Sequence, residues 1–339
     1  MKNMRFLRFG FCVAAVLSSA LIQGRALDRI ERTFMDFALN MPQTYNFEMN
    51  GLMNQQARLN DDFHGTASRM GLLGDLPGLS GIESFAGIRS AWLESDRTRG
   101  YEADLYNPYV GVVLQGSCQW NVGFVYSPGS IDIESFNDVV KGDGDAHHFG
   151  VFVSRQFQCG LKLGASYDYE TAALDLRDRV FAVNGDLDAD GHGVSLTAGY
   201  ARKFGENRLG RNIGFDVTAN FLYSKRQFEI QNGPLFFSEF DHEAWWFCLR
   251  TVVTHNLHDR VSMYGAFSIY QLLDENDRAR IPRFFGPTVP GVDRSFGEIG
   301  GGVVAMCGRG ISVDMGAKVH VFNQSYQAVI VALGLTCKF

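Results

Sequence analysis

The chain has 339 residues and a formal net charge of −6, with 46% hydrophobic and 13% aromatic residues. An acidic chain repels the phosphate backbone of DNA and RNA, so we expect no nucleic-acid partner. The length would allow two domains, but nothing after Ala26 resembles a flexible linker or a low-complexity tract. We therefore expect one main domain.

Residues 1–26 have the pattern of a secretory signal peptide. Three basic residues precede an apolar run from Phe9 to Ile22, and small residues lead up to an expected cleavage site after Ala26. The run is too short for an ordinary membrane-spanning helix. The pattern predicts an exported protein that this segment does not anchor.

Residues 27–84 form a separate N-terminal segment that begins with a helical pattern. Leu27, Ile30, Phe34 and Phe37 recur at the spacing of one helix face, with charged residues opposite. If the rest of the chain forms a wide barrel, such a helix is a candidate plug for its lumen. The alternative is a small helix in the periplasm, outside the barrel.

From residue 85 to residue 339, apolar and polar side chains alternate with the period of a β-strand. The clearest strands lie at Gly160–Glu170, His192–Lys203, Asn212–Ser224, Gly310–Phe322 and Ser325–Phe339. Weaker ones lie at Phe85–Glu94, Tyr106–Gln115, Cys118–Tyr126, His147–Phe157, Trp245–Thr254, Arg260–Tyr270 and Phe296–Met306. About 12 strands with one apolar and one polar face predict an all-β fold, a transmembrane antiparallel up-and-down β-barrel.

The connections and the aromatic residues support a membrane barrel. Short turns near residues 117, 159, 258 and 309 alternate with longer segments at 135–145, 176–191, 229–243 and 273–295. Periplasmic turns are short and outer loops long in such barrels, which places Phe339 at the periplasm. Aromatic residues near strand ends are typical of interfacial girdles, although any sheet is rich in aromatics. They are Trp120, Tyr126, Tyr167, Tyr169, Tyr200, Tyr223 and Trp245.

Three parts of the sequence carry a resemblance to a known family. Ala91–Glu94, the pair Gly193–Phe204 and Phe215–Tyr223, and the closing Gly334–Phe339 resemble the translocator domain of autotransporters. The resemblance implies a twelve-stranded barrel in the lipid of the bacterial outer membrane, with a helix through its lumen. An autotransporter also exports a passenger. Only about 27–84 precede the barrel here, so we expect none.

The closing strand is also similar to the signal that the barrel-assembly machinery recognises. Gly334, the apolar Cys337 and the terminal Phe339 occupy its main positions. The resemblance therefore implies this machinery as a partner.

Charged side chains on the polar faces of the strands are candidates for lining the lumen. A Lys or Arg that faces lipid at the bilayer midplane costs about 2–4 kcal/mol, so such residues turn inward. They are Lys162, Asp168, Asp216, Arg250, Glu298, Asp314, Lys318 and His320. With both signs present, they would either line a narrow pore or pair across the lumen and hold the barrel shut.

Two acidic clusters resemble metal sites only weakly. Asp186, Asp188 and Asp190 match the opening of a calcium loop, but Thr197 stands where such a loop needs a bidentate Glu. Residues 143–148 hold two aspartates and two histidines at an expected outer rim. Solvated loop residues are the favoured interpretation of both clusters, and we expect no metal.

No catalytic motif emerges from the sequence. It holds no Gly-x-Ser-x-Gly elbow, and no Ser, His and acid group fall at matching depths on neighbouring expected strands. We expect no enzyme activity and no cofactor. The main interpretation is an autotransporter-like outer-membrane barrel without a passenger, working as a structural or narrow-pore protein. An outer-membrane porin for small solutes and a secreted soluble β-sandwich are the alternatives, and the sequence leaves the oligomeric state open.

Overall fold

The structure is a computed structural model that describes eleven stretches of the chain. These are residues 79–95, 101–116, 120–135, 139–180, 183–204, 213–231, 237–258, 260–280, 294–308, 310–323 and 326–338. The expected signal peptide, the expected lumen helix and Phe339 lie outside the described residues. Within these stretches, no helix is long and apolar enough to cross a membrane.

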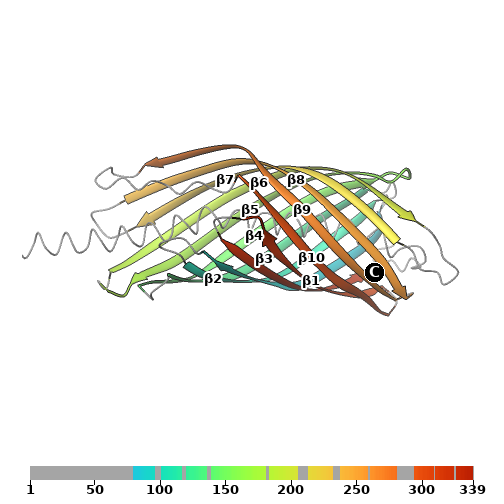
Figure 1. Cartoon of the computed structure of the whole chain (residues 1–339), viewed down its shortest axis with the longest axis horizontal. Helices are drawn as coiled ribbons and strands as arrows, with labels where there is room; N and C mark the ends of the chain where they lie inside the picture. Colours follow the sequence, from blue (N-terminus) through green and yellow to red (C-terminus); the bar gives the residue numbers. More distant parts are fainter. Residues whose placement is uncertain are drawn as a thin grey trace, which may run out of the picture.

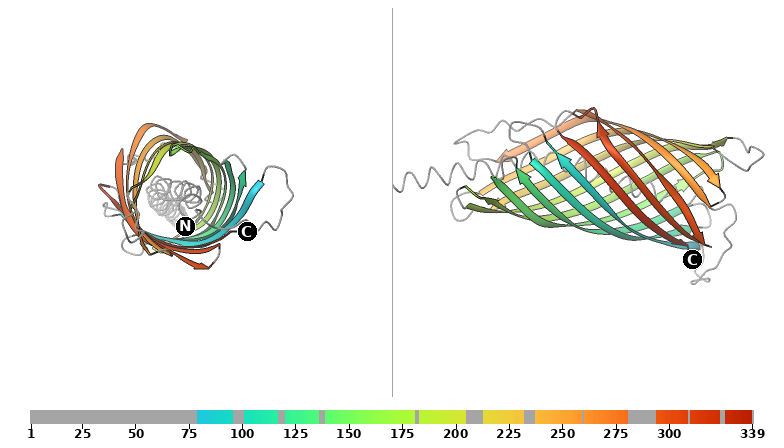
Figure 2. Two further views of the ribbon diagram at one scale, coloured as in Figure 1. Left: turned by 90° about the vertical axis from the view of Figure 1, so that its right-hand side faces the viewer. Right: turned by 60° about the horizontal axis from the view of Figure 1, so that its bottom comes forward.

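The described chain forms one closed sheet of twelve β-strands, each antiparallel to its neighbours. The strands are β1 (Leu79–Glu94), β2 (Tyr101–Gly116), β3 (Trp120–Ser135), β4 (Val140–Gln156), β5 (Leu161–Asp178), β6 (Val183–Phe204), β7 (Ile213–Gln231), β8 (Phe237–His258), β9 (Val261–Arg280), β10 (Ser295–Gly308), β11 (Ile311–Val321) and β12 (Gln327–Lys338). They run obliquely to the barrel axis, and β1 pairs with β12 to close the ring (Figures 1 and 2). The predicted up-and-down barrel of about 12 strands is confirmed. The soluble β-sandwich is wrong, because a single closed sheet has no second sheet to pack against.

The seam between β1 and β12 is held by an unbroken register. Pairing runs from Glu83 opposite Lys338 to Glu94 opposite Gln327 without a shift. In the middle, Gly87 faces Gly334, and the Tyr109 ring of β2 lies against both. A Cβ atom at Gly87 would lie 2.3 Å from the Leu333 carbonyl oxygen of β12 and 2.4 Å from the Tyr109 hydroxyl oxygen, so a larger residue requires both the β12 backbone and the ring to shift.

A belt of apolar side chains faces outward on every strand. One exposed member from each, in chain order, is Ile88, Val110, Phe124, Val151, Leu163, Leu196, Phe221, Leu249, Phe267, Ile299, Met315 and Leu333. Soluble proteins rarely expose an apolar patch of this extent, so the belt is the lipid-facing surface of a membrane barrel. The seven expected girdle aromatics also lie at outward positions and are exposed or half-buried.

Strands β2 to β8 continue beyond the belt at the end of the barrel opposite Lys338, and we call this part the outer extension. It comprises Tyr101–Leu105, Ile131–Ser135, Val140–Ala146, Thr171–Asp178, Val183–Asp190, Lys225–Gln231 and Phe237–Ala244. Here the two faces of the wall exchange character. Apolar side chains such as Leu105, Leu174 and Phe228 point inward and are buried, while Asp132 and Asp175 are exposed on the outside.

This exchange explains where the expected strand ends were wrong. Strand β5 continues to Asp178, β6 begins at Val183, and β7 continues to Gln231. The described residues of the expected loops at 176–191 and 229–243 are therefore mostly strand. The outward apolar pattern stops at the edge of the belt. Beyond it, the inverted alternation contains enough charge to resemble a polar loop.

Candidate functional site in the barrel lumen

The eight charged residues predicted to line the lumen all occupy inward positions, which alternate along each strand with outward belt residues. They form two groups around the barrel, which we call the first and second sides of the wall. The first side comprises Lys162, Asp168 and Asp216 on β5 and β7, and the second comprises Arg250, Glu298, Asp314, Lys318 and His320 on β8, β10 and β11. The inner face is therefore charged at depths where the outer face meets lipid.

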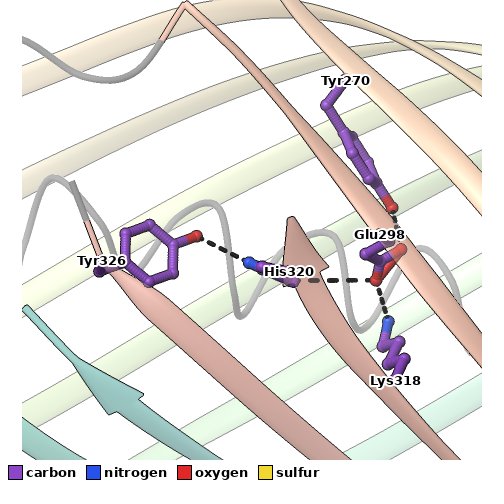
Figure 3. A network of polar contacts seen from close by, with 5 residues as sticks. All are labelled: Tyr270, Glu298, Lys318, His320 and Tyr326. Atoms are coloured by element: carbon purple, nitrogen blue, oxygen red, sulfur yellow. Dashed lines mark hydrogen bonds and ion pairs between the residues drawn. The ribbon is translucent and has the colours of Figure 1, made fainter. Parts of the chain in front are cut away.

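Glu298 is the centre of a buried polar network on the second side, formed with Tyr270, Lys318, His320 and Tyr326 (Figure 3). Tyr270 donates a hydrogen bond of 2.8 Å to Oε2 of Glu298, and Lys318 Nζ lies 2.5 Å from Oε1. His320 stands between Glu298 and Tyr326, with Nε2 4.0 Å from Oε1 and Nδ1 3.1 Å from the tyrosine hydroxyl. Side chains alone thus connect β9, β10, β11 and the residue before β12.

Aromatic packing fixes the orientation of this Glu298 network. The Phe296 ring stacks on Tyr270, with 4.4 Å between centroids and 5° between planes, and lies 5.0 Å from the His320 ring. Trp246, which is fully buried, meets Phe296 edge-on at 5.9 Å. Rings held on several sides leave the polar groups little freedom to rearrange.

A small recess of about 50 Å³ adjoins the Glu298 network on the lumen wall. Arg89, Arg250 and Lys318 supply three cationic groups to its lining, and the Glu298 carboxylate and the Tyr264 ring lie beside them. The recess is thus cationic overall. Sequence reasoning missed Arg89, although it precedes an exposed Trp92 by three residues and so has the inward parity of its strand.

The first side of the wall carries separate ion pairs. Lys162 Nζ lies 3.2 Å from Asp216 Oδ2. At the edge of the outer extension, Arg226 of β7 forms a buried ion pair with Glu170 of β5, and His148 Nε2 lies 3.5 Å from Glu170 Oε2. Arg226 was missed because β7 was expected to end at Ser224, where the outward alternation loses its apolar members.

The acidic residues considered as metal ligands lie on strands and not in loops. Asp186, Asp188 and Asp190 occupy successive outward positions of β6, whose extended backbone lacks the sharp turn of a calcium loop. In the 143–148 cluster, His147 faces outward and His148 inward. No group of three or more His, Cys, Asp or Glu side chains in the described stretches is arranged to hold a metal ion.

A ladder of aspartates crosses the outside of the outer extension. Asp104, Asp132, Asp143, Asp175 and Asp186 stand directly opposite one another on the five adjacent strands β2 to β6, and all are exposed. Like charges in direct opposition destabilise a sheet.

Farther round the outer extension, opposite charges are paired. Lys225 Nζ lies 3.1 Å from Glu243 Oε1, and this hydrogen bond raises the pKa of Lys225 above its ordinary value. The outside of the outer extension thus combines an unusually repulsive region with conventional surface pairs.

No protein-family model matches the sequence, and no curated protein matches it. Solved structures do match, and they place the fold in the class of closed β-barrels. The translocator domain of the autotransporter NalP from Neisseria meningitidis is similar with a TM-score of 0.64 and 11% identity, over 88% of this chain and 97% of that one.

Two further structures agree with this class. The transport unit of the autotransporter AIDA-I from Escherichia coli has a TM-score of 0.57 and 11% identity, over 86% of this chain and 98% of that one. An outer-membrane channel from Pseudomonas putida F1 has a TM-score of 0.52 and 10% identity, over 80% of this chain and 100% of that one. At these identities the likeness concerns the fold. Together with the outward apolar belt, it makes the chain an outer-membrane β-barrel.

Proposed function

We propose that the protein is a translocator-type barrel of the outer membrane whose lumen serves as a narrow, charge-lined passage and not as a catalytic site. One observation carries the proposal. The cationic recess of Arg89, Arg250 and Lys318 lies on the inner wall at positions whose outward neighbours belong to the belt. Charges of both signs on a lumen wall tune which ions pass.

The fold adds support from two directions. NalP and AIDA-I are named as autotransporters, and the similar parts are called a translocator domain and a transport unit. The protein from Pseudomonas putida F1 is named as a channel, which favours passage of small solutes as the second candidate function. The third candidate, the structural reading, is that the charges in the lumen have no role in passage. In that case the Glu298 network only stabilises the barrel wall.

We also propose that the barrel-assembly machinery inserts the protein by reading its closing strand, with Gly334, Cys337 and Phe339 as the signal residues. Deleting Phe339 should block assembly into the membrane while export continues. Protease resistance and anomalous gel mobility without boiling report assembly. Unchanged assembly would contradict this signal.

Planar-bilayer recording of the folded barrel tests the passage. We expect small, steady conductance steps, and we expect the double variant Arg89→Gln, Arg250→Gln to shift the reversal potential in a salt gradient toward cation preference. The control is Arg177→Gln, an exposed outward position of the outer extension, which should leave the reversal potential unchanged. A folded barrel without current, or one whose double variant keeps the original reversal potential, would favour the structural reading.

A further inference from the structure

Asp168 differs from the other inward charges on its side of the wall. It is 1% exposed, and neither carboxylate oxygen has a hydrogen-bond partner among the residues that the structure describes. Its neighbours are paired: Lys162 with Asp216, and Glu170 with Arg226. A buried carboxylate without a donor or a counter-charge is strongly destabilising, so this position calls for a positive group.

Glycines flank Asp168 on both sides in the sheet. Its direct neighbours across the sheet are Gly150 on β4 and Gly193 on β6, neither of which has a side chain. The carboxylate leans over Gly193, since its two oxygens lie 2.3 and 2.5 Å from where a Cβ atom of that residue would stand. The next residue along the same rung is Ser224 on β7, which is also buried and whose Oγ has no hydrogen-bond partner within the described stretches. No side chain stands between these oxygens along the rung.

The local charges do not cancel. Asp168 and Glu170 are inward neighbours on β5, and Arg226 is the guanidinium that pairs with Glu170. His148 approaches Glu170 as well, with 3.5 Å between Nε2 and Oε2. The group therefore has one carboxylate more than it has guanidinium groups, and the excess charge lies at Asp168.

We propose that Asp168 and Ser224 form a binding site for one small monovalent cation in the barrel wall. Carboxylate and hydroxyl oxygens are the ligands that hard cations prefer. A single charge matches the single excess carboxylate, and Gly193, which lies between the two residues on the rung, adds no side chain of its own. The site lies on the wall of the passage proposed above. Only its influence on permeation rests on that proposal, while its existence does not.

Thermal unfolding of the refolded full chain in detergent tests the site. We compare sodium chloride and potassium chloride with N-methylglucamine chloride at the same concentration, because the last cation is too large to be buried. The melting temperature should be about 3 °C higher with at least one of the small cations. Asp168→Asn should abolish this difference, and Ser224→Ala, which removes an oxygen but no charge, should reduce it.

Asp175→Asn is the matched control, because it makes the same change on the same strand at an exposed outward position. It should keep the full cation dependence. Equal melting temperatures in the three salts would overturn the site, as would an unchanged difference in Asp168→Asn. If Asp168→Asn is more stable than the parent and the parent shows no cation dependence, a proton neutralises the carboxylate and the cation site is likewise rejected. Should Asp168→Asn not fold, Ser224→Ala decides alone.

Bilayer recording separates this inference from the proposed function. Cation-dependent melting without any current would keep the site and reject the passage. Current without cation-dependent melting would keep the passage and reject the site.

Discussion

The belt and the outer extension are continuous along the same strands, yet they bury opposite faces. On β6, Leu196 is exposed to lipid while Ser195 is buried inside. Nearer the outer end of the same strand, Leu187 is buried inside and Asp186 is exposed. Hydrocarbon surrounds one region and water the other, so apolar side chains point outward in the first and inward in the second. The environment therefore decides which face of a strand is apolar, while the backbone geometry stays the same.

Trp246→Ala, two residues beyond the outer extension on β8, should destabilise the barrel most severely. Trp246 is fully buried against Phe296, and removing a buried tryptophan costs about 3–5 kcal/mol. Its sequence neighbour Trp245 is exposed on the outside, where it packs on Tyr223 at 4.8 Å. Trp245→Ala is the control and should cost much less. Urea titration of the folded barrel in lipid vesicles measures both, and equal losses would mean that the two faces do not differ as described.

Leu196→Arg tests the belt from its outer face. A charge directed into hydrocarbon near the midplane should destabilise the barrel by about 2–4 kcal/mol. The same residue introduced at the exposed Ala173 of the outer extension should cost little, since water solvates it and Asp145 and Asp188 lie in neighbouring positions. The assay is again unfolding in vesicles. If Ala173→Arg were as damaging as Leu196→Arg, the belt would not end where the structure places its edge.

Gly87→Val probes the seam between β1 and β12 within the belt. The added side chain meets the Leu333 carbonyl oxygen and the Tyr109 ring and should cost about 1–3 kcal/mol through overpacking. Gly265→Val is the control, because a Cβ atom there meets nothing within 4 Å. Melting of the folded form on unboiled gels compares the two. A harmless Gly87→Val would show that the β12 backbone at Leu333 and the Tyr109 ring both adjust without cost.

Asp143→Asn should produce the smallest effect and the opposite sign. It removes the middle charge of the aspartate ladder and should stabilise the barrel by roughly 0.2–1 kcal/mol. Asp145→Asn is the control, because its direct neighbours are Ser130 and Ala173 and carry no charge. A loss of stability in Asp143→Asn, measured by the same unfolding assay, would mean that this aspartate has a favourable partner.

The sequence was sufficient to predict those features of the fold and the site that depend on a single strand. Alternation placed Glu298 and Lys318 on inward faces, because the two faces of a strand follow directly from residue parity. It could not show that these two side chains meet, since their contact depends on the register between β10 and β11, where Lys318 stands opposite Gly300. The inward position of Arg226 could not be predicted for another reason. Its neighbours Lys225 and Gln227 face water, so the lipid signature that marks a barrel strand has already ended.

The aspartate ladder gives the outer rim an unusual response to salt. Neighbouring strands are about 4.8 Å apart, which is well inside the Debye length of about 8 Å at physiological ionic strength. The five carboxylates therefore repel one another jointly, and mobile counter-ions relieve that repulsion. The stability of such a rim should therefore increase with salt concentration, whereas salt weakens surfaces that exposed ion pairs stabilise.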